Sequence, residues 1–368
     1  MCDQATKKRR VVIVEPNFTG HRLYYVRLLV EEAARRGNDV FVILTEEAIH
    51  SAEYEVQLAP LIEQFRLRFL PQRGTPLDLI KLRELSVGLV ADVLVVPDGD
   101  GLARKMATSV RWRGPGTLNV LVLREKAQSN RIPGRAVVVN IAKWLIHHWA
   151  DRASDANIVL LKTALWQGRS SLTTANDPVT LRVTAQSVGK LRDEWGLTTP
   201  QHWFSVLGFV DKRKNLPLVL RSLSGLKSGR RIGLLIAGKC APEVLEESKP
   251  FLGQLRAAGA KVVLLDRFLT ENELDSAVAA VDTVVMAHSN EGSSGLFGKA
   301  VAAGTGIVAG GAKTLRRELA ASPGLGEWAP LNQGDLSVAL KRALDRRGPG
   351  HPRALGTDSF TSPLLGGR

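Results

Sequence analysis

The chain has little cysteine and no long hydrophobic run. Its two cysteines, Cys2 and Cys240, are too few for a disulfide framework or a cysteine-based metal cluster. No apolar stretch reaches about 18 residues, so no membrane-spanning helix is expected. The start, MCDQATKKRRVVIVEP, is basic, but its short apolar run ends at once in Glu and Pro, which makes a poor signal peptide. These absences predict a cytoplasmic protein, either soluble or peripheral on the inner face of the membrane.

Acidic residues are also in short supply. Fifty Lys and Arg residues stand against 36 Asp and Glu, which gives a formal net charge of +14. Such an excess favours anionic partners, namely nucleic acid, anionic lipid headgroups or phosphorylated substrates. We expect no nucleic-acid partner, because the sequence has no helix-turn-helix, zinc-finger or aromatic RNA-binding pattern.

Hydrophobic residues make up 44% of the chain and fall into short runs that alternate with helical patterns. The first run, 11–16, precedes a helix expected from about residue 22 to 36. The runs are continuous and rich in β-branched residues, as in strands buried on both faces of a parallel sheet. The other runs lie at 39–46, 64–71, 92–99, 119–125 and 156–161, and then at 204–210, 231–238, 261–268, 282–289 and 306–311.

A length of 368 residues favours two domains. Residues 169–189 are rich in Ser, Thr and Asn, which suits a hinge. We therefore predict an α/β chain of two doubly wound, Rossmann-like domains that face a central cleft. They span 1–185 and 186–345, and a Gly/Pro-rich tail, 346–368, is expected to be partly disordered. Ligands of such sheets bind at the carboxyl ends of the strands, so the cleft is the expected site.

A Gly/Ser loop follows the run at 282–289 and opens a helix. Ser293, Ser294 and Gly295 lie at the helix start, where the first N–H groups lack intrahelical partners and the helix dipole is positive. A diphosphate would be well placed there, and Gly292 and Gly295 permit close backbone approach. An ordinary strand–helix turn with a serine cap has the same pattern.

Two further groups lie at strand ends. Lys212, Arg213 and Lys214 follow the run at 204–210, where they would either hold phosphate oxygens or form a solvated basic loop. Gly20 and His21, in EPNFTGHRLYY, open the first helix of the N-terminal half. A single histidine in such a place is either catalytic or structural.

The second half contains four sequence blocks whose order is more specific than any one of them: GFVDKRKN, LLIAGK, DRFLTENELDSAVAAVDTVVMAHS and EGSSGLFGKAVAAGTGIV. Together, over about 204–340, they resemble the nucleotide-sugar-binding half of a retaining glycosyltransferase of family 4, which has the GT-B fold. The first half resembles the family more loosely, through FTGHRLYYVRLLVEEAARRGNDV and ADRASDANIVLLKTALW.

The resemblance implies roles for individual residues. Lys214 matches the lysine that holds the donor diphosphate, and Glu291 matches the glutamate that contacts donor sugar hydroxyls. Both are catalytic candidates, together with His21 in the loop that closes over the reacting centre. With the residues singled out above, the candidate donor-binding residues are Gly20, Arg213, Lys214, Gly292, Ser293, Ser294, Gly295, Leu296 and Lys299.

The chain departs from the family pattern in three places. Lys299 stands where the family has the glutamate that binds the ribose diol, and an ammonium has only donors. Lys299 would therefore reach a phosphate, pair with an acidic neighbour or point to solvent. Phe209 stands where the family often has Arg, a charge that Arg213 would have to supply, and the proline before Val308 is missing. These departures leave an inactive relative open.

The N-terminal half is expected to bind the acceptor. Arg124 and Glu125 stand at the end of the run at 119–125, where they would contact acceptor hydroxyls or form a salt-bridged loop.

Residues 140–152 form an amphipathic helical pattern. Ile141, Leu145 and Trp149 share one face, and Lys143 and His147 share another with Asp151. With the positive net charge, this pattern fits either docking on an anionic membrane surface or an ordinary helix that faces the core.

These patterns predict a glycosyltransferase that moves a sugar from a nucleotide-diphosphate sugar to a saccharide or lipid-linked saccharide, with retention. The nucleotide sugar would be a substrate, so no cofactor is expected. PDGDG at 97–101 fits a turn, and no metal is expected. The alternatives are a nucleotide-sugar epimerase of the same fold and a degenerate, non-catalytic binding subunit.

Overall fold

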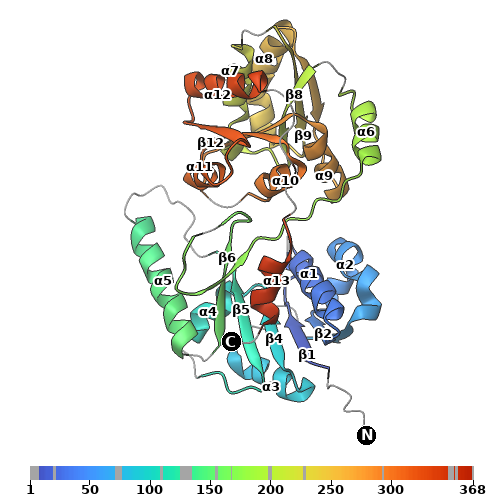
Figure 1. Cartoon of the computed structure of the whole chain (residues 1–368), viewed down its shortest axis with the longest axis vertical. Helices are drawn as coiled ribbons and strands as arrows, with labels where there is room; N and C mark the ends of the chain where they lie inside the picture. Colours follow the sequence, from blue (N-terminus) through green and yellow to red (C-terminus); the bar gives the residue numbers. More distant parts are fainter. Residues whose placement is uncertain are drawn as a thin grey trace. The chain divides into compact units, whose positions relative to one another are not determined.

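The computed structural model describes residues 8–19, 22–70, 77–107, 111–124, 135–153, 156–166, 168–197, 201–226, 229–291, 294–346, 352 and 355–366. The chain divides into two compact units (Figure 1). Unit 1 comprises Met1–Lys162, Gln167–Asp177 and Thr357–Arg368, and unit 2 comprises Thr163–Trp166 and Pro178–Gly356. No helix in the described part is long and apolar enough to cross a bilayer.

Unit 1 is built on a sheet of parallel strands in the order β3-β2-β1-β4-β5-β6-β7. The strands are β1 (Arg10–Val14), β2 (Asp39–Leu44), β3 (Arg66–Phe69), β4 (Val93–Val96), β5 (Thr117–Val122), β6 (Asn157–Lys162) and β7 (Thr173–Asn176). The helices are α1 (Arg22–Arg35), α2 (Ala52–Gln57), α3 (Leu79–Leu89), α4 (Asp100–Met106), α5 (Arg135–Ala153) and α13 (Asp358–Leu365), with short 3-10 helices η1 (Glu46–His50) and η2 (Ala59–Gln64).

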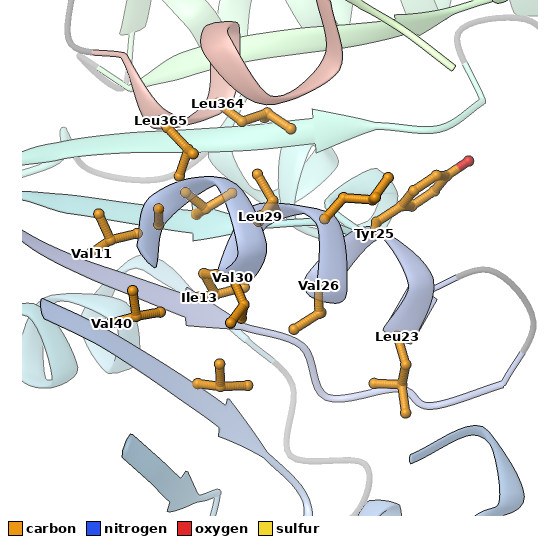
Figure 2. Packing of buried hydrophobic residues seen from close by; sticks show 14 of the residues in the cluster. Val11, Ile13, Leu23, Tyr25, Val26, Leu29, Val30, Val40, Leu364 and Leu365 are labelled. Atoms are coloured by element: carbon orange, nitrogen blue, oxygen red, sulfur yellow. The ribbon is translucent and has the colours of Figure 1, made fainter. Parts of the chain in front are cut away.

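Both faces of this sheet are covered by helices, as the continuous hydrophobic runs predicted. Val11 and Ile13 of β1 point into a core with α1, and Figure 2 shows them beside Val26 and Leu29. The alternate residue Val12 enters a second core on the opposite face, with side chains from α3, α4 and α5. A strand whose successive residues enter two cores must be apolar throughout.

The C-terminal tail corrects one expectation. Within the tail predicted to be partly disordered, α13 packs in the core of unit 1 (Figure 1). Phe360 and Leu364 are fully buried, and Figure 2 shows Leu364 and Leu365 among the residues of this core. The side-chain amide of Asn119 donates to the carbonyl oxygens of Leu364 (2.6 Å) and Gly366 (3.1 Å). Apolar residues at i, i+4 and i+5 give this short helix a buried face, although Gly and Pro dominate the residues before it.

Unit 2 repeats the plan, with parallel strands in the order β10-β9-β8-β11-β12-β13. The strands are β8 (Gln201–Leu207), β9 (Arg231–Ala237), β10 (Lys261–Leu265), β11 (Thr283–His288), β12 (Gly306–Gly311) and β13 (Gly326–Ala329). The helices are α6 (Ala185–Glu194), α7 (Leu216–Ser224), α8 (Pro242–Ala257), α9 (Glu271–Ala280), α10 (Gly295–Ala303), α11 (Lys313–Ala320) and α12 (Gln333–Asp345), with the 3-10 helix η3 (Lys212–Lys214).

The segment expected to be a hinge, 169–189, is shared between the two units. Its first part contains β7, the last strand of the unit 1 sheet, and the part from Pro178 onward belongs to unit 2. There Val179 packs so closely on α10 that a Cβ on Gly298 would overlap it. The boundary therefore lies at residue 178 rather than at the expected 185.

Strand order reverses at β1/β4 in unit 1 and at β8/β11 in unit 2. In doubly wound sheets the connections leave opposite faces at such a switch point, which opens a crevice at the carboxyl ends of the strands. The two switch points therefore position the candidate sites.

Candidate functional site

The turn after β8 holds Lys214 at the switch point of unit 2. Its ammonium donates a hydrogen bond to the carbonyl oxygen of Leu207, the last residue of the strand. Gly208 follows with a φ of +78°, and a Cβ on the neighbouring Gly238 would overlap the Gly208 carbonyl group. The turns after β8 and β9 thus pack backbone against backbone, which only glycine permits.

The electrostatics of this turn are dominated by burial. Burial lowers the pKa of Lys214 to about 8, while Asp211 opposes the shift and Arg213 adds to it. The exposed Arg213 guanidinium pairs with Asp211 (Nε–Oδ2 2.7 Å). Lys214 therefore carries a charge at neutral pH that is only partly solvated, which is the state in which a cation attracts an anion most strongly.

Hydrogen bonds tie this turn to the end of β11. The Ser289 N–H donates to the Arg213 carbonyl oxygen (2.9 Å), and the Asn215 side-chain amide donates to the Ala287 carbonyl oxygen (2.7 Å). The structure thus brings the cationic turn, expected from sequence to hold phosphate, to the strand end from which the Gly/Ser loop departs.

Glu291 has a defined partner that the sequence did not reveal. Its carboxylate accepts the N–H groups of Lys313 (2.9 Å) and Thr314 (3.1 Å) and the Thr314 hydroxyl (3.1 Å), so it caps the start of α11. Burial opposes ionisation, but these bonds outweigh it and hold the pKa of Glu291 below its ordinary value. The expected contact with donor sugar hydroxyls stays a prediction.

The start of α10 has the expected features in part. Ser294 is the N-cap, but its side chain makes no capping hydrogen bond, and α10 begins at Gly295 with Leu296 in its first turn. The first N–H groups of a helix lack intrahelical acceptors, so an anion remains the expected partner. Gly292 and Ser293 lie outside the described residues.

Lys299 adopts one of its three anticipated arrangements, because it pairs with an acidic neighbour. Its ammonium donates to Asp275 on α9 and to the carbonyl oxygen of Thr180 (3.3 Å). The side chain of Asp275 is only 4% exposed. These two bonds use two of the three N–H donors of the ammonium, and Asp275 offsets its charge, so the pairing argues against the expected donor-binding role.

His288, the last residue of β11, is a site residue that sequence reasoning missed. Burial, Lys214 and Arg213 together lower its pKa to about 4, so the ring is neutral at pH 7. Its Nε2 is buried and has no hydrogen-bond partner among the described residues. Nothing in the sequence around His288 marks it as a site residue, because the lowering of its pKa depends in part on cations from another turn.

In unit 1 a cavity of about 520 Å³ lies at the carboxyl ends of β1, β4 and β5. Arg124, an expected acceptor residue, lines it. Asp100 fixes the loop by accepting the N–H groups of Leu123 (2.9 Å) and Arg124 (3.1 Å), and Lys143 donates to the Arg124 carbonyl oxygen (2.8 Å). The other candidates of this half, Glu125, Gly20 and His21, lie outside the described residues.

Glu15 is a second residue that the sequence did not single out. It follows β1, is 1% exposed, and accepts the N–H of Asn17 (2.9 Å). Its Oε2 is buried and has no hydrogen-bond partner in the part of the chain that is described. Burial raises its pKa to about 8, and the nearby carboxylate of Asp98, which pairs with Arg22 (2.6 Å), adds to the shift.

Helix α5 contributes Ala150 to the second core, but its largest apolar side chains point the other way. Lys143 and His147 line the cavity, so the polar face points inward. The apolar face is exposed: Ile141 is 55%, Leu145 54% and Trp149 66% accessible. The amphipathic pattern was recognised from the sequence, and the structure shows which face meets solvent.

Several solved structures resemble the chain over nearly its whole length. A glycosyltransferase from Rickettsia africae matches with a TM-score of 0.64 at 10% identity, covering 98% of this chain and 92% of its own. HepE of Anabaena, solved in complex with UDP, matches with a TM-score of 0.60 at 14% identity (97% and 92% covered). Sucrose-phosphate synthase of Thermosynechococcus elongatus gives 0.58 at 13% identity (97% and 94%).

The chain has a GT-B fold. The sequence itself matches no protein-family model and no curated protein. At these identities the likeness establishes the fold alone, and the resemblance to retaining family 4 stays a prediction.

Proposed function

We propose that the chain is a glycosyltransferase that takes a sugar from a nucleotide-diphosphate sugar bound to unit 2. The observation that carries the proposal is the cationic turn at the β8/β11 switch point of a GT-B fold, with Lys214 held against the end of β8 and joined to β11. Open α/β sheets bind ligands at such a point.

The proposed chemistry places developing negative charge on the leaving diphosphate. The Lys214 ammonium and the first N–H groups of α10, near Ser294, would stabilise that charge, since both are fixed before the reaction. Transfer with retention is proposed from the sequence resemblance. The nucleotide sugar enters as a substrate, and the acceptor is a saccharide or lipid-linked saccharide bound by unit 1.

Thermal stabilisation by a panel of nucleotide sugars tests the proposal. A ligand at 100 times its Kd stabilises the folded state by about 2.7 kcal/mol, which raises the Tm measurably. We expect one or more nucleotide sugars to raise the Tm of the wild type and not that of Lys214→Gln. Nucleotide release in the presence of saccharide acceptors then establishes transfer. A wild-type Tm that no nucleotide sugar moves would contradict the proposal.

A non-catalytic binding subunit is the second candidate function, and the Lys299–Asp275 pair favours it. Lys299 of α10 is bonded to Asp275 of α9, and an ammonium has only donors, so position 299 supplies no acceptor for a ribose hydroxyl. Exposed Phe209 in the turn after β8 adds no charge. If the chain binds a nucleotide sugar but releases no nucleotide from it with any tested acceptor, this candidate is favoured over transfer.

We also propose that unit 1 docks on an anionic membrane surface through α5. Two tryptophans, Trp144 and Trp149, are 53% and 66% exposed on its outer face, beside Ile141 and Leu145. Tryptophan favours the bilayer interface, where its ring is buried and its N–H stays hydrated. The excess of basic residues in the chain complements anionic headgroups.

Flotation with vesicles tests the docking. The wild type is expected to float with vesicles that contain phosphatidylserine and less with neutral ones, and the double variant Trp144→Ser/Trp149→Ser is expected to remain at the bottom. Phe268→Ser in unit 2, which removes a 75% exposed aromatic side chain, serves as the matched control. Equal flotation of all three proteins would contradict docking through α5.

A further inference from the structure

The cavity of unit 1 has a strongly positive lining. It occupies about 520 Å³, a volume typical of small-ligand sites, at the β1/β4 switch point. The charged side chains that line it are the cations Arg22, Arg104, Lys105, Arg124 and Lys143 and the carboxylates Asp98 and Asp100. With histidine counted as neutral, the lining carries a surplus of three positive charges.

The two carboxylates are already committed within the fold. Asp98 pairs with Arg22 (2.6 Å), and Asp100 accepts two backbone N–H groups of the loop after β5. Backbone donors fix the Asp100 carboxylate in place through Oδ1, and within the described residues it forms no ion pair with Arg104 or Arg124. The positive surplus is therefore a property of the folded lining.

The two arginines keep donors available. Arg104 makes one long bond, from Nε to the Asp100 carbonyl oxygen (3.4 Å), and both Arg104 and Arg124 are exposed. A guanidinium has five N–H donors in a planar fork that matches the oxygens of phosphate. Two such groups at one cavity are arranged for an anion that accepts several hydrogen bonds at once.

We propose that this cavity binds the acceptor through a phosphate monoester, so that the acceptor is a phosphorylated sugar or a phosphorylated lipid headgroup. The assignment rests on the proposed function for its use in catalysis. A phosphate monoester carries nearly two charges and three terminal oxygens, and offsets the lining better than a single carboxylate. An uncharged sugar would leave the surplus uncompensated in a partly enclosed site.

Calorimetric titration of the full chain compares three probes of similar size: glucose 6-phosphate, glucuronate and glucose. We expect glucose 6-phosphate to bind at least about tenfold more tightly than the other two, since a phosphate monoester accepts several charge-assisted hydrogen bonds from the guanidinium groups at once. The affinity is expected to fall as salt rises. Equal binding of phosphate and uncharged probes would overturn the proposal, and preference for glucuronate would assign the cavity to carboxylates instead.

Variants separate this cavity from the donor site. Arg124→Gln and Arg104→Gln are expected to weaken glucose 6-phosphate by about tenfold each and to leave UDP affinity unchanged. Lys214→Gln is expected to do the reverse. Arg83→Gln, which removes an exposed arginine of α3 outside the cavity, is the matched control for both ligands.

The outcomes distinguish the two proposals. If UDP binds and glucose 6-phosphate does not, the next probe is vesicles that contain phosphatidic acid, whose headgroup is the same monoester. Binding there that Arg124→Gln abolishes assigns a lipid source, whereas tight binding of the soluble ester assigns a sugar phosphate. If neither glucose 6-phosphate nor phosphatidic-acid vesicles bind while UDP does, only the cavity assignment is overturned. If UDP does not bind while the phosphate monoester does, only the donor site is overturned.

Discussion

Lys299 on α10 forms an ion pair with Asp275 on α9, and this pair holds the segment after Pro178 against these two helices of unit 2. Asp275 also accepts the N–H of Arg182 (2.9 Å), and Lys299 also donates to the Thr180 carbonyl oxygen (3.3 Å). One pair therefore joins two helices and the entering chain. Position 299, which matches the ribose-binding position of the family that the sequence resembles, therefore stabilises the fold in this protein.

Removal of Lys299 is expected to destabilise unit 2 strongly. Lys299→Met leaves the Asp275 carboxylate buried without its charge partner, and breaking a buried pair in this way costs about 3–5 kcal/mol. The double variant Lys299→Met/Asp275→Asn is expected to recover most of that loss, because the amide is neutral and still accepts from Arg182. Urea unfolding of Lys299→Met, Asp275→Asn, the double variant and the wild type measures the coupling free energy.

The control for this cycle is an exposed pair. Lys190 and Glu194 on α6 are 74% and 57% exposed and 3.6 Å apart, so Lys190→Met is expected to cost about 0–1 kcal/mol. A loss at Lys299 no larger than at Lys190 would contradict the structural role assigned to the buried pair.

Glu291 is expected to serve stability whether or not it also contacts a donor. Glu291→Gln keeps an acceptor but removes the charge at the start of α11, so a loss of about 0.5–2 kcal/mol is expected, as for a helix cap. If Glu291 also holds the donor sugar, turnover falls about a hundredfold as well. Thermal unfolding and nucleotide release measure the two effects separately.

Thr314→Val provides the matched comparison for Glu291. It removes the hydroxyl that donates to the same carboxylate (3.1 Å) without touching the carboxylate itself. A similar loss of Tm with unchanged turnover in Thr314→Val, against lost turnover in Glu291→Gln, would assign Glu291 to the donor. If turnover tracks Tm in both variants, Glu291 is a cap only.

The fold could be predicted from the sequence because its strands are buried on both faces. Continuous β-branched runs marked most strands, but β7 (Thr173–Asn176) and β13 (Gly326–Ala329) were not predicted. The first is polar and the second contains Gly and Glu, since each lies at the edge of its sheet. An edge strand needs only one strand partner and tolerates polar residues, so these two edges give little sequence signal, whereas the edge strands β3 and β10 kept apolar runs.

Only the parts of the site that depend on neighbours close in sequence could be predicted. Lys214 and the loop before α10 lie at strand ends, and strand ends can be read from periodicity. The partners of Glu291 and Lys299 come from other elements, 22 and 24 residues away for Lys313 and Asp275. Such pairings depend on which helices become neighbours, and the local patterns of one sequence do not reveal this.

Donor affinity is expected to depend on the charge of Lys214. Its pKa in the free protein is about 8, and a bound diphosphate favours the ammonium. Between about pH 7 and 8, where the terminal phosphate of UDP is already ionised, UDP affinity is therefore expected to change little, and above about pH 8 to fall by up to about tenfold per pH unit. Titrations at pH 7.5 and 9, in buffers of different ionisation enthalpy, are expected to show proton uptake on binding at the higher pH.

Lys214→Arg is the diagnostic variant for this pH dependence. Arginine stays protonated throughout the range, so any binding that it retains is expected to be independent of pH between 7.5 and 9. A wild-type affinity that does not change across this range, or a decline that persists in Lys214→Arg, would show that another group controls binding.

Glu15 is expected to make unit 1 less stable as the pH rises. Its pKa in the folded chain is about 8, above its ordinary value of 4.5, so the fold favours the protonated form. The resulting stabilisation is complete below pH 4.5 and is lost as the pH rises through about 8, at a rate of up to about 1.4 kcal/mol per pH unit. Glu15→Gln mimics the protonated acid and keeps an acceptor for the N–H of Asn17. The variant is therefore expected to gain stability over the wild type progressively from pH 5 to pH 8.

Unfolding of the two proteins across this pH range isolates Glu15, because the other titrating groups are common to both and cancel in the difference. Glu63→Gln, which alters an exposed glutamate of η2, is expected to give a curve parallel to that of the wild type. If Glu15→Gln is also parallel to the wild type, the carboxyl group must titrate near its ordinary value. Oε2 would then have to be reached by water, and the buried acid at the carboxyl end of β1 would be ionised at the pH at which the cavity beside it binds its ligand.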